Sequence, residues 1–330
     1  MYKDVFIDII NTCNAKCPFC ITGINKPINK KYLAPDVFNN ILKSLIKNQA
    51  INNHSLIHLY NWGEPLLHTN LSELVEIINK NNLLYGLSTN GSIEFNFPDY
   101  FYANLNYLKF SLPGFSEESY KKIHGFNFKK ILINIEHIIH KVKKENSKTN
   151  IELNFHIYQF NLDEIKACSD FAKKLNVNFN PNNAILNHWD NLNLYLEKKL
   201  PYEELFDVSQ MLLMYNFNDL LGESPNDYKC PQLDLLVIDE NGNVIGCCQL
   251  PKDNKEYICG NIITDSWPKI LENKTSMTVC ANCLKKGLAY YFHNSLISFD
   301  FIKFSNIENA TTLDLSKLII KRFKQKFFSA

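Results

Sequence analysis

Arginine is almost absent from this chain. Of its 35 basic residues, 34 are lysines and only Arg322 is an arginine. Because arginine supplies the forked hydrogen bonds that recognise phosphate and guanine, such recognition is nearly unavailable here. The net charge is only +1, so no basic excess exists to drive nucleic-acid binding. We therefore expect no nucleic-acid partner.

Long apolar runs and a targeting leader are also lacking. No stretch approaches the roughly 18 apolar residues that span a bilayer. The N-terminus, MYKDVFIDIINTCNAKC, contains no basic-plus-apolar segment that a signal peptidase would remove. We expect a cytoplasmic protein without a transmembrane segment. Disulfides are rare in that compartment, so the ten cysteines indicate metal binding or redox chemistry.

What the chain does contain is a regular alternation of strands and helices. Runs of apolar and β-branched residues alternate with segments of helical periodicity, which is typical of a parallel α/β fold. Six such units are too few for a closed eight-stranded barrel, so the pattern allows a partial barrel or a doubly wound sheet. The predicted strands cover residues 4–10, 56–61, 84–88, 107–112, 151–158 and 177–180.

Three cysteines follow the first predicted strand directly. Cys13, Cys17 and Cys20 form a C-x3-C-x2-C motif, and thiolates at this spacing can converge on one metal centre. Three thiolates on a four-iron cluster would leave one iron open to a small molecule. Structural zinc sites usually have four protein ligands. A zinc knuckle completed by a distant ligand and three unrelated buried thiols are therefore the alternatives.

This motif resembles the cluster loop of the radical S-adenosylmethionine (SAM) enzymes, with Phe19 just before the last cysteine. The resemblance covers most of residues 4–185. In that family three thiolates hold a [4Fe–4S] cluster whose fourth iron chelates SAM. The reduced cluster cleaves SAM to methionine and a 5'-deoxyadenosyl radical, which abstracts a hydrogen atom from the substrate. The resemblance implies an electron donor such as flavodoxin or ferredoxin.

Further motifs of the family follow the next strands in the correct order. Residues 61–65 (NWGEP) resemble the family's Gly-Gly-Glu-Pro element, which binds the SAM amino group, with Trp62 in place of the first glycine. His124 lies where the family commonly has an arginine. Parallel α/β folds gather their ligands at such strand ends. The resemblance implies that SAM is bound by Phe19, Gly63, Glu64, Ser88, Asn90, Ser111 and His124.

A second group of cysteines lies in the last third of the chain. A hairpin with Gly242 at its turn and Cys247 at its exit precedes a Cys280-x2-Cys283 pair. This arrangement is similar to the auxiliary-cluster domain called SPASM in its long form and twitch in its short form. No cysteine follows Cys283, so the match is to the short form. It implies a second [4Fe–4S] cluster, and the alternative is a zinc site built from the same residues. The implied ligands are Cys230, Cys247, Cys280 and Cys283.

Two residues of this region are candidates for catalysis. Radical epimerases of similar layout use a thiol to return a hydrogen atom to the opposite face of the substrate, and Cys248 is the candidate here. Asp234 is a candidate base for removing a substrate proton. A structural cysteine and an exposed carboxylate are the alternatives. Cys168 and Cys259 are expected to be buried core thiols.

The predicted fold is therefore α/β, with a partial (β/α)6 TIM-like barrel over residues 1–186. A helical linker over 187–228 leads to a small twitch/SPASM-like auxiliary-cluster domain over 229–290. Residues 291–330 are expected to form a C-terminal helical tail.

The resemblance implies a radical SAM oxidoreductase or epimerase. We expect it to dehydrogenate or epimerise a polar small molecule of the amino sugar or aminocyclitol type. The chain begins about a dozen residues before Cys13, which leaves no room for an N-terminal peptide-recognition domain and favours a small molecule. One alternative is radical modification of a ribosomally made peptide by epimerisation, a cross-link or a thioether. Another is a non-catalytic zinc-binding interaction protein.

Overall fold

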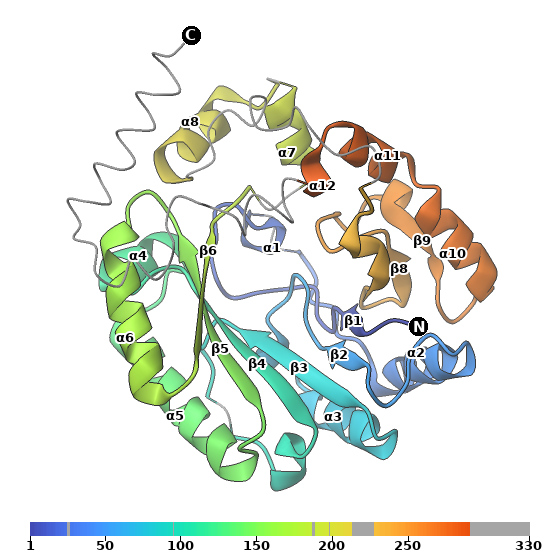
Figure 1. The fold of residues 1–330 in the computed structure, drawn as a ribbon, viewed down its shortest axis with the longest axis horizontal. Helices are drawn as coiled ribbons and strands as arrows, with labels where there is room; N and C mark the ends of the chain where they lie inside the picture. The colour runs from blue at the N-terminus through green and yellow to red at the C-terminus, as the bar shows by residue number, and fades with distance from the viewer. Residues whose placement is uncertain (25–26, 95, 187–188, 198, 213–227, 291–330) are drawn as a thin grey trace.

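The computed structural model describes residues 1–24, 27–94, 96–186, 189–197, 199–212 and 228–290. A mixed sheet runs through these ranges in the order β6-β5-β4-β3-β2-β1-β7-β8-β9 (Figure 1). Neighbouring strands are parallel except in the β7–β8 and β8–β9 pairs. The strands are β1 (Asp4–Ile7), β2 (Leu56–His58), β3 (Leu84–Thr89), β4 (Leu105–Leu112), β5 (Asn150–Ile157), β6 (Asn178–Asn183), β7 (Leu235–Ile238), β8 (Asn243–Ile245) and β9 (Ile258–Asn261).

The parallel strands β1 to β6 lie side by side in chain order. A doubly wound sheet reverses its order partway along, whereas a barrel keeps each strand beside its predecessor. The observed order therefore distinguishes the two architectures that the sequence pattern allowed. The predicted α/β fold with a partial (β/α)6 barrel is confirmed.

Helices connect successive strands along the outer side of the sheet (Figure 1). The helices are α1 (Ile21–Ile24), α2 (Pro35–Lys47), α3 (Leu71–Lys80), α4 (Glu117–Ile123), α5 (Phe128–Glu145), α6 (Ile165–Leu175), α7 (Trp189–Leu196), α8 (Tyr202–Met211), α10 (Trp267–Thr275), α11 (Thr278–Lys285) and α12 (Leu288–Tyr290). Short 3-10 turns are η1 (Pro65–Leu67), η2 (Asp99–Tyr102), η3 (Leu162–Glu164), η4 (Pro231–Asp234) and η5 (Lys255–Tyr257).

Local sequence signals mark where two of the outer helices begin. The side chain of Ser116 accepts a hydrogen bond from the backbone N–H of Ser119 at the start of α4. Asn127 does the same for Lys130 at the start of α5. Such N-caps satisfy backbone donors that the first helical turn leaves unpaired.

Alternation along the strands separates the core from the barrel interior. Every second residue of a strand faces the helices, and on β4 the residues Leu108, Phe110 and Leu112 are completely buried there. The residues between them, including Lys109 and Ser111, line an interior cavity. The core therefore lies between sheet and helices, and the inner face is left for polar groups.

The auxiliary segment, residues 228–290 with the second group of cysteines, continues the barrel sheet. Strand β7 pairs in parallel with β1, from Asp4 opposite Leu235 to Ile7 opposite Ile238. The hairpin partner β8 and then β9 extend the sheet further (Figure 1). The sequence pattern gave no sign of this pairing. It fixes the second cysteine region directly beside the first strand of the barrel.

Several boundaries differ from expectation. Strand β6 runs through Pro181, which pairs opposite Phe155, because an edge strand tolerates the missing N–H of proline. The predicted linker contains α7 and α8, while residues 213–227 and the predicted helical tail over 291–330 lie outside the described residues. The domain limits stay predictions. Among the described helices, none is long and apolar enough to cross a bilayer.

Candidate active site

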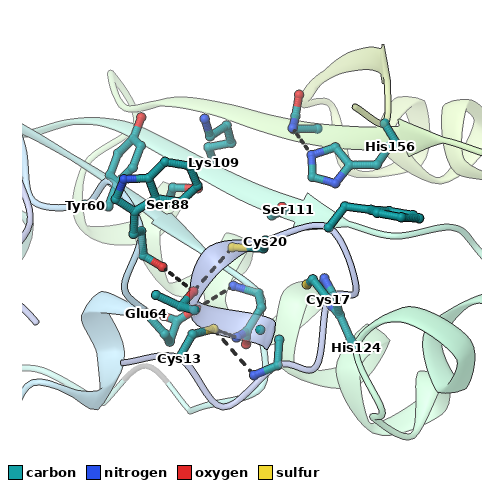
Figure 2. Close-up of a pocket in the computed structure, with 18 of the residues that line it drawn as sticks. Cys13, Cys17, Cys20, Tyr60, Glu64, Ser88, Lys109, Ser111, His124 and His156 are labelled. Carbon is teal, nitrogen blue, oxygen red and sulfur yellow. Dashed lines mark hydrogen bonds between the residues drawn. The ribbon is translucent and has the colours of Figure 1, made fainter. Parts of the chain in front are cut away.

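A cavity of about 400 Å³ opens where the parallel strands end. It is bordered by the cysteine loop after β1, by the segment that follows β2, and by the carboxyl ends of β3 and β4. Figure 2 shows Cys13, Cys17 and Cys20 on one side, with Lys109 and His156 on the other. The cavity thus brings together all of the residues that the family resemblance assigned to the first cluster and to SAM. These are Cys13, Phe19, Cys17, Cys20, Gly63, Glu64, Ser88, Asn90, Ser111 and His124.

The cysteine loop is tightly wound and offers hydrogen bonds to a sulfur. The backbone N–H of Ala15 and the Nδ2 of Asn90 lie 3.4 Å and 3.7 Å from the Cys13 Sγ. Burial raises the pKa of Cys13 to about 11, so a free thiol here stays protonated at neutral pH. A Cβ added to Gly23 would lie 2.1 Å from the Cys17 carbonyl oxygen, so the loop requires glycine there. Three thiols facing one cavity, one with N–H donors, fit a metal–thiolate centre.

Glu64 is held rigidly at the floor of the cavity. It is 3% exposed, and its carboxylate accepts hydrogen bonds from the backbone N–H groups of Leu66 and Asn90 at 3.1 Å and 2.8 Å. Its own N–H donates to the Thr12 carbonyl at 3.0 Å. Burial raises the pKa of Glu64 to about 7. The carboxylate is therefore fixed beside the cysteine loop and titrates near neutral pH.

The preceding residue, Gly63, is tied to the auxiliary segment through a buried ion cluster. Its N–H donates to Asp8 Oδ1 at 3.0 Å. The other oxygen of Asp8 lies 2.7 Å from the Lys252 ammonium, which lies 2.7 Å from Glu240 Oε2 as well. Flanking carboxylates raise the pKa of Lys252 although burial opposes this, so the lysine stays charged. Lys252 thus connects the segment after β8 to the NWGEP loop.

The far wall of the cavity carries polar side chains that no motif identified. Asn154 and His156 of β5 are hydrogen bonded at 2.9 Å, and Asn182 of β6 donates to Asn154 at 2.6 Å. The Lys109 ammonium lies 5.0 Å from the centre of the Tyr60 ring, and burial lowers its pKa. The sequence feature that could have identified them is the polar residue at every second position of β4 and of β5, since alternate residues of a strand face the same side.

Both cavity histidines are neutral at neutral pH. Burial lowers the pKa of His124 to about 3 and that of His156 to about 4. His124 therefore cannot replace the positive charge of the arginine that the family commonly has at this position. Among the described residues, its Nδ1 and the Nε1 of Trp62 are buried with no hydrogen-bond partner. Both residues line the cavity, so a bound polar group would satisfy them.

The four cysteines of the second group come together from three segments. Cys230 precedes η4, Cys247 follows β8, and Cys280 and Cys283 lie three residues apart on α11. Burial raises the pKa of Cys283 to about 12, and the negative charges of Cys230 and Cys280 add to this shift. Such an effect requires that the thiols be close. Among the described residues, no three His, Cys, Asp or Glu side chains surround a single-ion site.

The two candidate catalytic residues lie outside the cavity lining. The Cys248 thiol donates to Gln232 Oε1 at 3.2 Å, and burial raises its pKa to about 11, so it keeps its hydrogen. The neighbouring Gln249 does line the cavity. Asp234 is exposed at the end of η4. Roles for Cys248 and Asp234 stay predictions.

Two other cysteines behave as the sequence indicates. Cys168 on α6 and Cys259 on β9 are 0% and 1% exposed and belong to the apolar core. Neither lines the cavity. They are structural thiols.

Comparison with known proteins agrees with this geometry. Residues 7–155 match the model of the Radical SAM superfamily. A probable GTP 3',8-cyclase of Methanocaldococcus jannaschii is 27% identical over 177 residues, which are 52% of this chain and 56% of that relative. A second, from Methanococcus maripaludis strain C5, is 27% identical over 172 residues, 51% of this chain and 54% of the relative. The chain thus spans about half the length of the relatives it matches.

Solved structures share the fold. The structure of anSMEcpe with bound AdoMet covers 86% of this chain and 85% of its own, at 15% identity and a TM-score of 0.56. SuiB of Streptococcus suis bound to S-adenosylmethionine covers 88% of this chain and 71% of its own, at 14% identity and a TM-score of 0.55. At these identities the likeness concerns the fold alone. The strand order and the cysteine-lined cavity agree with the family match: residues 7–155 form a domain of the radical SAM superfamily, whose members use S-adenosylmethionine and a [4Fe–4S] cluster.

Proposed function

We propose that this protein is a radical SAM enzyme of the twitch type that removes a hydrogen atom from a polar small molecule, with dehydrogenation or epimerisation as the outcome. One observation carries the proposal: three cysteines and seven further residues, from separate segments, line one cavity. The cluster and SAM supply the hydrogen-abstracting chemistry when bound. The protein positions SAM and the substrate and excludes water.

Each group of cavity residues has a proposed role. Cys13, Cys17 and Cys20 hold the first cluster. Glu64 accepts a hydrogen bond from the SAM amino group, while Ser88, Asn90 and Ser111 offer polar contacts to the rest of the cofactor. With His124 neutral, hydrogen bonds rather than an arginine-type ion pair hold the carboxylate of SAM. The proposed chemistry needs an electron donor, such as a flavodoxin or ferredoxin.

The wall formed by Lys109, Asn154, His156 and Asn182 supports a hydroxyl-rich substrate. Amides and a neutral imidazole hydrogen bond well to hydroxyl and amino groups. An amino sugar or aminocyclitol is the substrate class that we propose. Lys109 is the one lysine among the described lining residues. A nucleoside triphosphate such as GTP, named for the relatives, would find too little positive charge, and we expect it not to bind.

The auxiliary site is proposed to hold a second [4Fe–4S] cluster on Cys230, Cys247, Cys280 and Cys283. The likeness of the hairpin and the Cys280-x2-Cys283 pair to the twitch domain supports a cluster rather than a zinc ion on these four cysteines.

Metal analysis tests the proposal as a whole. Protein purified without oxygen should contain about eight irons and about eight sulfides per chain. With a strong reductant and SAM it should form 5'-deoxyadenosine. About four irons per chain would show that the auxiliary cluster is absent. Two zincs per chain without sulfide would overturn the whole proposal.

The burial of Glu64 predicts that SAM affinity depends on pH. Its pKa of about 7 means that the free protein loses the carboxylate form as the pH falls. Since SAM binding uses the carboxylate, we expect the affinity to fall about tenfold per unit below about pH 7. Titration calorimetry at several pH values measures the SAM affinity. The control, Glu64→Gln, should bind SAM more weakly, and the slope of its log affinity against pH should be smaller by one proton. An equal slope in both proteins would contradict this role.

Cys248→Ala distinguishes the two outcomes for the substrate. SAM cleavage should persist in either case, because the proposal assigns Cys248 to neither the first cluster nor SAM. An epimerase that uses this thiol would stop inverting its substrate, whereas a dehydrogenase would be largely unaffected. Product configuration and 5'-deoxyadenosine are measured together with aminocyclitol substrates. Full turnover with inversion would show that Cys248 is not the hydrogen donor.

A further inference from the structure

Lys274, on α10, is a buried lysine beside the second group of cysteines. It is 1% exposed and is among the largest fully buried side chains of the described residues. Its ammonium donates to the carbonyl oxygens of Gly246 at 2.9 Å and of Gln232 at 3.2 Å. Among the described residues no carboxylate forms an ion pair with it. Its charge is therefore met by carbonyl dipoles alone.

Such a burial is costly unless a negative charge lies nearby. An isolated buried ammonium loses its hydration, and two carbonyl groups replace only part of it. Elsewhere in this chain, by contrast, Lys252, whose side chain is 16% exposed, has two carboxylates. The position of Lys274 therefore calls for an anion that is formed by neighbouring side chains or by a group they bind.

The neighbouring side chains are cysteines. Burial is the main influence on the pKa of Cys230 and of Cys280 and raises both, while the charge of Lys274 acts in the opposite direction on each. The Lys274 charge therefore lies near both of these side chains. Four thiolates around either a four-iron cluster or a zinc ion leave a net negative charge on the assembly.

The hydrogen bonds of Lys274 also hold the segments that carry these cysteines. Gly246 directly precedes Cys247, and Gln232 lies two residues after Cys230. One ammonium therefore connects two of the three segments of the auxiliary site and brings a positive charge to the place where they meet.

We propose that Lys274 is the built-in counter-charge of the anionic metal–thiolate centre on Cys230, Cys247, Cys280 and Cys283, and that it raises the reduction potential of the cluster there. The inference rests on the auxiliary cluster of the proposed function. A nearby positive charge favours the more negative, reduced state of a cluster, and burial strengthens the effect. Lys274 makes the auxiliary cluster a better electron acceptor than its four thiolates alone would.

Two neutral variants test this inference. Lys274→Met removes the charge and the hydrogen bonds, whereas Lys274→Gln removes the charge and keeps an amide donor. Lys269→Met is the matched control, because Lys269 lies on the same helix with its side chain 58% exposed. Iron, sulfide and zinc contents, SAM binding, and potentials from electron paramagnetic resonance titrations are measured on whole, anaerobically reconstituted proteins.

We expect both Lys274 variants to keep the first cluster and SAM binding. Where the auxiliary cluster is retained, the equilibrium constant for its reduction should fall at least tenfold. This lowers the reduction potential by about 59 mV for a one-electron couple. Where it is not, iron should drop from about eight to about four per chain. Lys269→Met should match the unaltered protein.

The outcomes separate this inference from the proposed function. About four irons and no zinc in the unaltered protein would overturn the auxiliary cluster and the inference that depends on it. About eight irons with an unchanged potential in both variants would overturn the role of Lys274 alone. Loss of both clusters and of SAM binding in both variants would make Lys274 a folding residue and also overturn it. Zinc in the second site that both variants lose would support the counter-charge and contradict the iron cluster.

Discussion

Cys17→Ala should abolish SAM cleavage and remove about four irons per chain. Cys17 is one of three cysteines that face the cavity, and the described lining residues include no fourth cysteine to replace it. With two thiolates the cluster would expose a second iron to solvent, and no reduced cluster would remain to activate SAM. Iron content and 5'-deoxyadenosine formation measure the effect, which should reach the background rate.

Cys168→Ala is the matched control for this prediction. Cys168 is a completely buried cysteine of α6 that lies outside the cavity, so its loss should cost about 1 kcal/mol of stability through packing and leave the iron content unchanged. If Cys17→Ala retained full iron and SAM cleavage, the assignment of the first cluster would be wrong. If Cys168→Ala lost iron equally, the effect would be one of folding.

The parts of the site that could be predicted from sequence are local ones. Each cofactor motif follows its strand within a few residues, so its type and its strand-end position can be seen in a short window. Ser88 and Ser111 were implied by the resemblance of their strand ends to motifs of the family. The resemblance also implied the roles of Cys13, Cys17 and Cys20, and the structure gathers all five residues around one cavity.

The remaining features depend on contacts between distant segments. Pairing of β7 with β1 joins residues more than 200 positions apart, and neither strand carries a signal for the other. Burial, too, is a tertiary property: the sequence could name His124 but could not show that the ring is neutral.

Lys252→Met should lower the free energy of unfolding by about 3–5 kcal/mol and weaken SAM binding. The side chains of Asp8 and Glu240 are 2% and 6% exposed, and both lie 2.7 Å from the Lys252 ammonium. Without the lysine, two buried carboxylates face one another with no counter-charge. Asp8 also accepts the N–H of Gly63, so a shift of this carboxylate moves the NWGEP loop that we assign to SAM.

The loss of stability in Lys252→Met should depend on pH, because the two carboxylates that remain gain or lose protons. Burial already raises the pKa of Glu240, and removal of the lysine charge raises it further. A carboxyl whose pKa is higher in the folded protein than in the unfolded chain destabilises the fold as the pH rises and the group must ionise. Lys252→Met should therefore be most damaging at alkaline pH and partly relieved toward acid pH.

Urea denaturation at several pH values and calorimetric titration with SAM measure both effects. Lys80→Met is the control, because Lys80 pairs with Glu76 at the surface, where an ion pair contributes at most about 1 kcal/mol. Adding Glu240→Gln to Lys252→Met should restore part of the stability, since it removes one of the two unpaired carboxylates. If Lys252→Met and Lys80→Met differed by less than about 1 kcal/mol and bound SAM equally well, the buried ion cluster would not connect the auxiliary segment to the SAM loop.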